Sequence, residues 1–269
     1  GSDRYTIAPK IWRILRLMPH RWRCRFARTI QPWIRLGGDA AGVFSGSVSG
    51  KARLGELRSK GERVAGLLAA KQLQDLYFAI FCHWQDPAKM VEDCAESRTI
   101  LDGPAQFGGV RETAQRLMFF DTVFYLPDDI LVKLDRASMA VSLESRVPLL
   151  DHRVVEFAAR LPRSLKIRKG RTKWVLRKVL DKYVPSRLTE RPKMGFSLPL
   201  GEWLRGPLRD WAEALLNETR LQNEGFFKPA PIRRLWLAHQ AGKTGAQYQL
   251  WDVLMFQAWW EHWAKNRTD

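Results

Sequence analysis

Cysteine and histidine are scarce in this 269-residue sequence. The three cysteines (Cys24, Cys82 and Cys94) are too few and too scattered to form a disulfide framework. The five histidines include no pair separated by three or four positions, so the spacing of a histidine–cysteine metal site is absent. We therefore expect reduced cysteines and no metal site, which favours a cytoplasmic location.

Long hydrophobic runs are also missing. No apolar segment approaches the roughly 18–20 residues needed to cross a bilayer, so we expect no transmembrane helix. The sequence opens on Gly1-Ser2-Asp3-Arg4 without the pattern of a signal peptide. Gly1-Ser2 without an initiator methionine is typical of residues left by cloning, and we expect the natural chain to extend upstream.

Strand patterns and common catalytic motifs are equally absent. No segment shows sustained alternation of apolar and polar residues, and no G-x-S-x-G motif occurs. The run from Gly46 to Lys51 is one residue short of a phosphate-binding loop and follows no expected strand. It also has Ala52 where Mg²⁺ needs a hydroxyl. We interpret this glycine-rich run as a mobile loop.

Acidic residues are outnumbered. Lys and Arg total 45 against 28 Asp and Glu, which gives a formal charge of +17. The first sixty residues hold thirteen basic and only three acidic residues. An excess of this kind fits an anionic partner such as nucleic acid or a lipid surface. It equally fits a solvated helical face in a protein that handles anionic substrates, which is the interpretation we favour.

What the sequence does contain is helical periodicity, so the expected fold class is mainly α. The expected helices cover 8–35 with breaks at Pro19 and Pro32, 60–82, a short piece after Pro87, 113–124 ending near Pro127, 130–143, 151–161 with Asp151 as N-cap, 172–182, 203–216 and 246–265. We divide the chain into a basic helical segment (1–36), a flexible loop (37–59) and a helical region (60–269).

The richest stretch in polar, chemically useful residues is 131–200. Asp135, Ser138 and Ser142 fall on one face of an otherwise apolar helix, and such a stripe is costly to bury unless it is paired or lines a site. Basic residues of this stretch suit phosphate oxygens: Arg136, Arg146, Lys173 and Lys193. The alternative is a set of structural ion pairs, such as Glu144 with Arg146, and the residues alone leave both interpretations open.

Three ordered motifs in this stretch carry a resemblance. The run DRASMAVSLESRVPLLD, from Asp135 to Asp151, resembles the signature of the glutamine-hydrolysing asparagine synthetase family. Lys173-Trp-Val-Leu-Arg177 and the loop Arg191-Pro-Lys-Met-Gly-Phe196 are similar to the family's later motifs and follow in the same order. The resemblance covers 115–216 and, more weakly, the C-terminal helices. In detail, the sequence of these motifs most resembles that of bacterial homologues associated with polysaccharide or secondary-metabolite gene sets.

The departures from the family pattern define which part is present. The catalytic N-terminal cysteine, the Ser-Gly-Gly-x-Asp-Ser pyrophosphate loop and the Phe-Gly-Gly-Tyr motif are all missing from this sequence. The resemblance therefore implies the helical C-terminal half of an ATP-pyrophosphatase-type synthetase domain (adenine nucleotide α-hydrolase-like), with the parallel sheet largely missing. We expect the isolated chain to be inactive.

The resemblance also implies a chemistry and a set of site residues. In the family, ATP adenylates the aspartate side chain with release of pyrophosphate, and ammonia from glutamine then displaces AMP. ATP and Mg²⁺ serve the full-length enzyme, and we expect neither to be bound by this fragment. Lys173 matches the lysine that stabilises phosphoryl charge and is the expected catalytic residue. Residues expected on the acceptor, ammonia or nucleotide side, or closing over the site, are Asp135, Arg136, Glu144, Arg146, Arg191 and Lys193.

The partners that follow are a missing glutaminase domain and the sheet half of the synthetase domain in the same chain, with aspartate and glutamine or ammonia as small substrates. We also expect self-association of the isolated chain, because seven tryptophans in its first and last helices need a partner layer. We disfavour nucleic acid and membrane partners. Two alternatives remain: an amidotransferase acting on another carboxylate, such as a sugar acid, and a non-enzymatic basic helical module that binds an anionic polymer or membrane.

Overall fold

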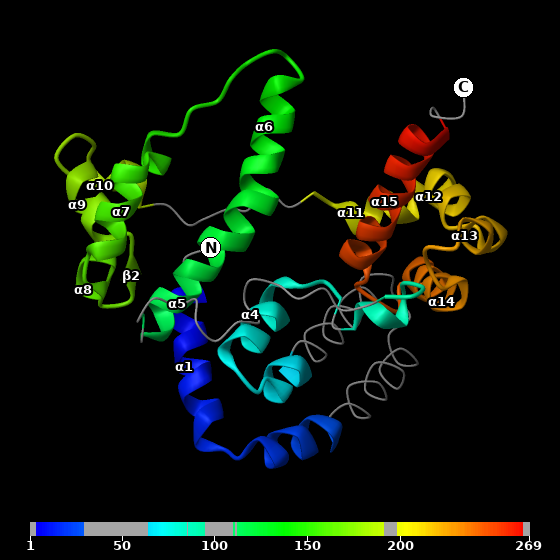
Figure 1. The fold of residues 1–269 in the computed structure, drawn as a ribbon, viewed down its shortest axis with the longest axis horizontal. Coiled ribbons are helices and arrows are strands. Elements are labelled where there is room, and N and C mark those ends of the chain that lie inside the picture. The colour runs from blue at the N-terminus through cyan, green and yellow to red at the C-terminus, as the bar shows by residue number, and fades with distance from the viewer. Residues whose placement is uncertain are drawn as a thin grey trace. The chain divides into compact units, whose positions relative to one another are not determined.

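The computed structural model describes residues 4–29, 64–84, 86–94, 110, 112–190 and 198–265. These residues are mainly helical, with one short two-stranded hairpin, which confirms the expected fold class. The chain divides into two compact units, one built from residues 1–16 and 99–195 and the other from 17–98 and 196–269 (Figure 1). No helix within the described residues is long and apolar enough to cross a membrane.

The first unit is a succession of helices with the hairpin inserted near its end. The N-terminal helix α1 (Arg4–Leu17) contributes all but its last residue to this unit, and its Tyr5 hydroxyl donates a hydrogen bond to Asp121. The other elements are α5 (Thr113–Phe120), η2 (Asp121–Leu131), α6 (Val132–Met139), η3 (Pro148–Leu150), α7 (His152–Arg160), α8 (Arg163–Lys166), β1 (Ile167–Arg168), β2 (Arg171–Thr172), α9 (Trp174–Leu180) and α10 (Ser186–Thr189).

Pro127 does not end a helix, contrary to the expectation from sequence. The chain is helical without interruption from Thr113 to Met139, and the stretch Asp121–Leu131 that contains Pro127 is a π-helix. Proline lacks the amide that a normal α-helical turn requires and its ring crowds the preceding turn. The wider π turn gives the proline ring more room, and the helix continues through it.

Local capping and breaking signals were correctly predicted elsewhere. The Asp151 carboxylate accepts the backbone N–H of Arg153 at 2.9 Å and caps α7, as expected. The chain is also interrupted before His20, where Pro19 stands. The expected helix 203–216 is instead two helices, because the turn at 206–208 separates α11 from α12.

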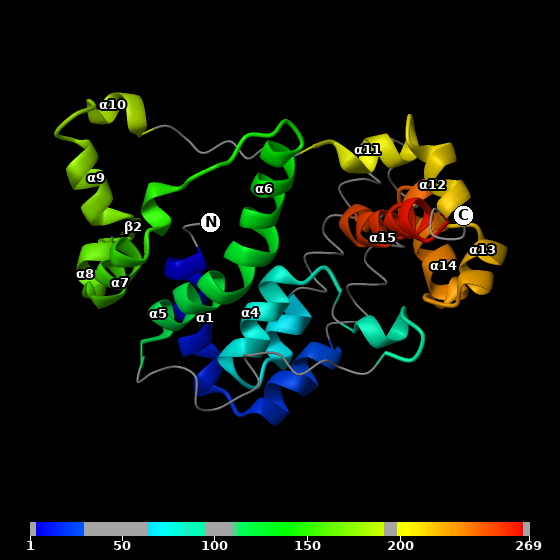
Figure 2. The same ribbon diagram turned by 45° about the horizontal axis from the view of Figure 1, so that its top comes forward.

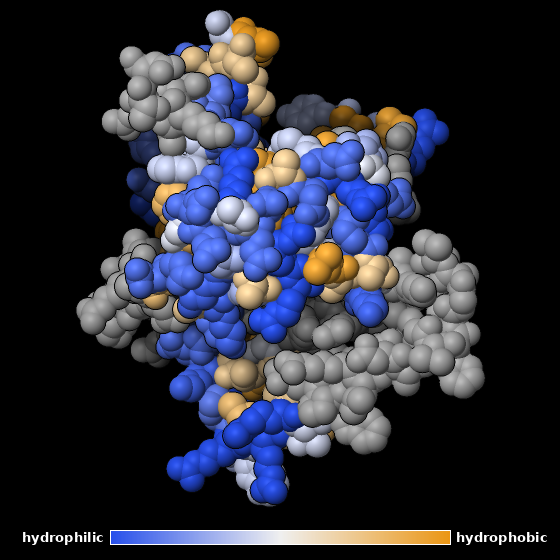
Figure 3. All heavy atoms as spheres, turned by 90° about the vertical axis from the view of Figure 1, so that its right-hand side faces the viewer, coloured by the Kyte–Doolittle hydropathy of each residue, from blue (hydrophilic) through white to orange (hydrophobic). Residues whose placement is uncertain are grey.

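The second unit holds the best-defined core. Its elements are helical residues 20–29 and 64–69, α4 (Leu73–Phe81), η1 (Pro87–Lys89), α11 (Leu200–Arg205), α12 (Arg209–Leu215), α13 (Glu218–Glu224), α14 (Pro229–Gln240) and α15 (Gln247–Lys265). The core of the last five helices is centred on Leu204, Leu216, Ile232, Trp236 and Leu250, all essentially inaccessible to solvent. The face shown in Figure 3 is mainly hydrophilic, with only small separate hydrophobic spots.

Several expectations lie on residues that the structure does not describe. The break at Pro32, the flexible loop 37–59 and most of the loop 190–199 fall outside the described ranges. The division into 1–36, 37–59 and 60–269 therefore stays a prediction.

Candidate functional site

The expected catalytic lysine follows a tight hairpin. Strands β1 and β2 pair antiparallel, with Ile167 opposite Thr172 and Arg168 opposite Arg171. The two turn residues between them, Lys169 and Gly170, both have positive φ angles, of 49° and 77°. Two-residue hairpin turns favour this backbone because it matches the twist of the strands. Each strand of the hairpin has only two residues, so the sequence shows no alternating pattern there.

Lys173 forms the junction between this hairpin and α9. Its backbone is left-handed (φ 58°, ψ 35°). It is the N-cap residue of α9, whereas the sequence predicted that it would lie in the first turn of the helix. A non-glycine residue in this conformation costs roughly 1–3 kcal/mol unless its surroundings hold it there. The side chain is exposed, and no hydrogen bond or ion pair engages it among the described residues.

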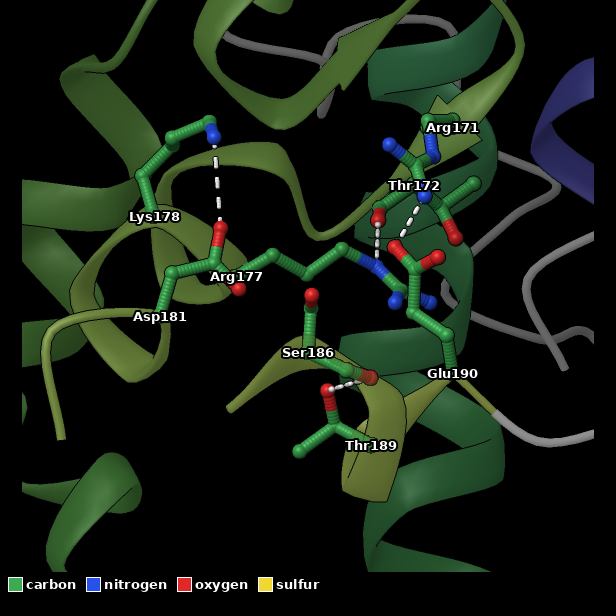
Figure 4. A network of polar contacts seen from close by, with 8 residues as sticks. All are labelled: Arg171, Thr172, Arg177, Lys178, Asp181, Ser186, Thr189 and Glu190. Atoms are coloured by element: carbon green, nitrogen blue, oxygen red, sulfur yellow. Dashed lines mark hydrogen bonds and ion pairs between the residues drawn. The ribbon is translucent and has the colours of Figure 1, made fainter. Parts of the chain in front are cut away.

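Arg177 supplies a contact that holds this junction. Its Nε–H donates to the carbonyl oxygen of Thr172 at 3.0 Å (Figure 4). Its backbone N–H donates to the carbonyl of Lys173 at 2.9 Å. Thr172 is itself buried. One residue of α9 therefore binds the two peptide groups that flank the left-handed turn.

Further contacts tie the hairpin to α9 and α10. Arg171 forms an ion pair with Glu190, which follows α10 (Figure 4). The ring of Trp174, at the start of α9, lies 5.2 Å from the Arg168 guanidinium and 5.1 Å from the Lys178 ammonium. Lys178 also contacts Asp181 at 3.2 Å. Cations near the ring fix its position while keeping their charge in solvent.

The charge of this region is strongly positive. Residues 160–190 contain eleven lysines and arginines and only two acidic residues, Asp181 and Glu190. Both acids are used by the contacts just described. Five exposed cations of this stretch then have no ion pair within the described part of the chain: Arg168, Lys169, Lys173, Lys182 and Arg187. The arrangement is suited to attracting an anion with several charges, such as a polyphosphate.

The polar residues of α6 and the segment after it are exposed rather than buried. Asp135 and Arg136 lie on the exposed surface of α6, so the polar stripe carries no burial cost in this structure. Glu144 and Arg146 form an ion pair at 2.7 Å, with side chains 69% and 84% exposed. That is the pair expected from the structural interpretation of these residues, and at such exposure it contributes little stability.

The structure does not join these residues to Lys173. Within the described residues, no hydrogen bond or ion pair connects Lys173 with Asp135, Arg136, Glu144 or Arg146, and α9 stands apart from α6 in both ribbon views (Figures 1 and 2). The other two expected site residues, Arg191 and Lys193, lie outside the described residues.

Sequence reasoning missed part of the supporting network. Arg177 was visible only as the end of a motif, and the pairing of Arg171 with Glu190 joins residues 19 positions apart. Trp174 and its two cations were also missed. Only Lys178 had a usable signal, because it lies four residues after Trp174 on the same helix.

Large apolar side chains are exposed on α7, on α9 and in the segments that follow α6 and α9. Phe157 is 63% exposed and Tyr183 is 79% exposed, and large side chains at Val141, Leu143 and Leu176 are also open to solvent. Surfaces of this kind usually meet another polypeptide. They are consistent with a helical half that lacks a covering layer.

These features describe a helical protein with a basic hairpin-to-helix junction fit for an anionic group. The family model described as asparagine synthase matches residues 1–261, and the chain belongs to that family. It is similar to a putative glutamine-hydrolysing asparagine synthetase of Mycobacterium tuberculosis, with 39% identity over 145 residues. It is also similar to asparagine synthetase [glutamine-hydrolyzing] 1 of Bacillus subtilis, with 33% identity over 144 residues.

Each of these alignments covers 54% of this chain and only 22% of the relative. The matched segment therefore spans about a fifth of the relatives' length. A more distant relative is the amidase chry2 of Gibberella zeae, 31% identical over 141 residues, which cover 50% of this chain and 20% of that protein. No solved structure matches this chain significantly.

Proposed function

We propose that this chain forms the helical C-terminal part of the synthetase domain of a glutamine-hydrolysing asparagine synthetase. The reaction is the ATP-dependent amidation of aspartate through an acyl-adenylate, with release of pyrophosphate and AMP. The observation that carries the proposal is the family match over residues 1–261, combined with relatives named as glutamine-hydrolysing synthetases.

Lys173 has the catalytic role in this proposal. Adenylation brings a carboxylate against a triphosphate and builds negative charge on the departing pyrophosphate, so a fixed cation lowers the barrier. Lys173 is exposed, engages no carboxylate within the described residues and follows a two-stranded hairpin. Its position at the start of α9 adds the N–H groups of the first turn, which also favour anions.

The remaining candidates have supporting roles. Asp135, Arg136, Glu144 and Arg146 shape the acceptor, ammonia and nucleotide side in the assembled domain. Arg191 and Lys193 close over the site. In this scheme the exposed Glu144–Arg146 pair is available to exchange its contacts for contacts with a substrate.

Among the residues that the structure describes, the donor set fits a phosphate group better than a metal ion. No cluster of three or more His, Cys, Asp or Glu side chains capable of holding a metal occurs among the described residues. We therefore assign no residue here to Mg²⁺ and derive no step through it. The basic junction at Lys173 fits the phosphates of ATP, which the family uses as a substrate.

The partners of the site lie in the same enzyme. We propose that a glutaminase domain delivers ammonia, that a parallel sheet supplies the other wall of the nucleotide site, and that the protein acts in the cytoplasm. In this account the chain alone, without these two parts, is inactive.

A second candidate is amidation of a different carboxylate by the same chemistry. It is favoured by the match to the fungal amidase chry2, whose name does not mention asparagine. A screen of carboxylate substrates separates the two candidate functions. The readout is pyrophosphate release, and the protein tested is this chain extended with the N-terminal regions that its relatives carry. Release that depends on aspartate supports the first candidate. Release that depends only on a sugar acid or another carboxylate supports the second.

A further inference from the structure

A cysteine and a histidine lie in contact on the basic helix of residues 20–29. Cys24 Sγ lies 3.2 Å from His20 Nε2 and 3.8 Å from Nδ1, one helical turn away. Cys24 is partly buried and bonded in no disulfide. A thiol within reach of an imidazole is the pairing from which cysteine nucleophiles are built.

A second contact of His20 indicates which atom carries the proton. Nε2 lies 3.0 Å from the carbonyl oxygen of Ala69, the last residue of the helix 64–69. A carbonyl oxygen only accepts hydrogen bonds, so Nε2 must carry hydrogen. The Cys24 sulfur, which lies beside the same Nε2–H, is then placed to accept a hydrogen bond from it.

Arg23 fixes the position of this pair. It is 5% exposed, and its guanidinium donates to the carbonyls of Leu68 and Ala70 at 3.3 and 2.6 Å and to Met18 at 3.2 Å. These bonds attach the helix 20–29 to the end of the helix 64–69, which brings the Ala69 carbonyl to His20. They also place a buried positive charge on the residue next to Cys24.

The surroundings of Cys24 are positively charged throughout. Residues 4–29 contain eight lysines and arginines and no acidic residue. Arg21 and Arg28 are exposed and lie three residues before and four residues after Cys24, on the same side of the helix. Cysteines in partly exposed, electropositive surroundings are the reactive ones in proteins.

We propose that Cys24 is a reactive thiol that exchanges with small disulfides bearing carboxylate groups, with His20 and the flanking arginines as its recognition elements. The Cys24 thiol gives its proton to Nδ1, the imidazole nitrogen that carries no hydrogen and lies 3.8 Å from the sulfur, and the thiolate attacks one sulfur of the disulfide. The disulfide S–S bond breaks, a mixed disulfide forms on Cys24, and the other half leaves as a thiolate that takes the proton back from the imidazolium. The incoming disulfide is the oxidant and is itself half reduced.

The other two cysteines are internal controls. Burial of the Cys82 thiol and the nearby Asp252 carboxylate raise its pKa, and it follows α4 rather than lying on a basic helix. Cys94 lies in the turn after η1. Neither shares the contact with histidine that Cys24 makes with His20, as far as the described residues show.

The test uses the full chain and two reagents, the dianionic 5,5′-dithiobis(2-nitrobenzoate) and the neutral 4,4′-dithiodipyridine. Modified peptides are quantified by mass spectrometry at short times, so all three cysteines are compared in one unmodified protein. With the anionic reagent at low salt, Cys24 is expected to react about tenfold faster than Cys82 or Cys94. This advantage should shrink at about 1 M salt, where the Debye length is about 3 Å.

Variants separate the recognition elements from simple exposure. His20→Gln should slow the reaction of Cys24 with both reagents, whereas Arg28→Gln should slow it only with the anionic reagent. Circular dichroism checks that each variant is folded. Equal rates for the three cysteines of the wild-type chain, or a Cys24 rate that His20→Gln leaves unchanged in a folded protein, would overturn the proposal. Either result is independent of the synthetase assignment.

Discussion

Lys173 occupies a backbone conformation that lysine rarely adopts, directly after a hairpin and directly before a helix. Its side chain therefore leaves the chain from a point with fixed peptide groups on both sides. Electrostatic catalysis requires a cation held near the place where charge develops on a substrate, and the fixed backbone at Lys173 supports the role that we propose for it.

Replacing Lys173 by alanine in the extended protein should lower the rate of pyrophosphate release by about 10²–10³-fold, because loss of one charge-stabilising contact costs about 2.7–4 kcal/mol. Lys182→Ala is the matched control, because it removes an equally exposed charge at the end of α9. The Lys173 assignment is wrong if the Lys173→Ala enzyme is folded and keeps near-normal turnover.

His239 is the residue whose titration should govern stability in mild acid. It is fully buried near the end of α14, with its ring 6.3 Å from that of Trp236. Burial, helped by the charge of Arg205, lowers its pKa from 6.5 to about 4, while the backbone of Gly201 and Thr244 acts in the opposite direction.

Because the pKa of His239 is lower in the folded state than in the unfolded state, its contribution to stability is present above pH 6.5 and is lost as the pH falls towards about 4. The free energy of unfolding should fall in this window by about 3 kcal/mol at most. Urea unfolding followed by circular dichroism at several pH values measures it. His239→Leu should flatten the profile, and an identical slope in both proteins would show that other groups are responsible.

At the scale of elements, the β1–β2 hairpin and α9 act as one unit through Arg177. Arg177→Lys keeps the charge but loses the Nε–H that binds the Thr172 carbonyl. We expect about a tenfold lower rate of pyrophosphate release in the extended protein, because a hydrogen bond from a charged group is worth about 1.5–3 kcal/mol.

The control for Arg177 is Lys178→Gln on the same helix, which removes an exposed pair with Asp181 and the ammonium beside the Trp174 ring but leaves the Thr172 and Lys173 carbonyls bound. Its rate should stay close to that of the wild type. If both variants lose activity equally, the effect comes from α9 in general, and Arg177 has no special role in positioning Lys173.

The elements that sequence reasoning predicted correctly are those fixed by neighbours in the chain. Asp151 caps α7 through an amide two residues away, and Pro19 interrupts the helices on either side of it. The prediction that a helix ends near Pro127 was wrong because a π-helical stretch replaces the α-helical turn that proline disfavours. The hairpin of 167–172 is too short for strand periodicity to appear.

The candidate site was predictable only in part for a related reason. The motif at Lys173 is continuous in sequence, so the resemblance located it. The Arg171–Glu190 pair and the Trp174 contact with Arg168 depend on how the chain folds back on itself, and no local pattern encodes such distances. The relation between Lys173 and the residues of α6 depends on packing as well.

For the whole molecule, two opposing properties should govern association. Apolar side chains are exposed on both units, including Phe157, Tyr183, Trp259 and Trp263 at 53–79%. The formal charge of +17 opposes contact between copies. Salt screens this repulsion, since the Debye length falls from about 10 Å at 0.1 M to about 3 Å at 1 M.

Self-association of the isolated chain should therefore strengthen as salt rises, whereas binding to an anionic polymer should weaken. Light scattering across a salt series measures the mass of the particles directly. A monomer at every salt concentration would show that the helices cover their own apolar faces and that no layer is missing.

The assignment to the synthetase is tested most directly by pyrophosphate release with ATP, Mg²⁺, aspartate and ammonia, measured side by side for this chain and for the extended protein. The account predicts aspartate-dependent release by the extended protein and none by this chain alone. Turnover by this chain at about 1 s⁻¹ or faster, a rate typical of enzymes, would contradict it. So would an extended protein that is folded and releases no pyrophosphate with any carboxylate.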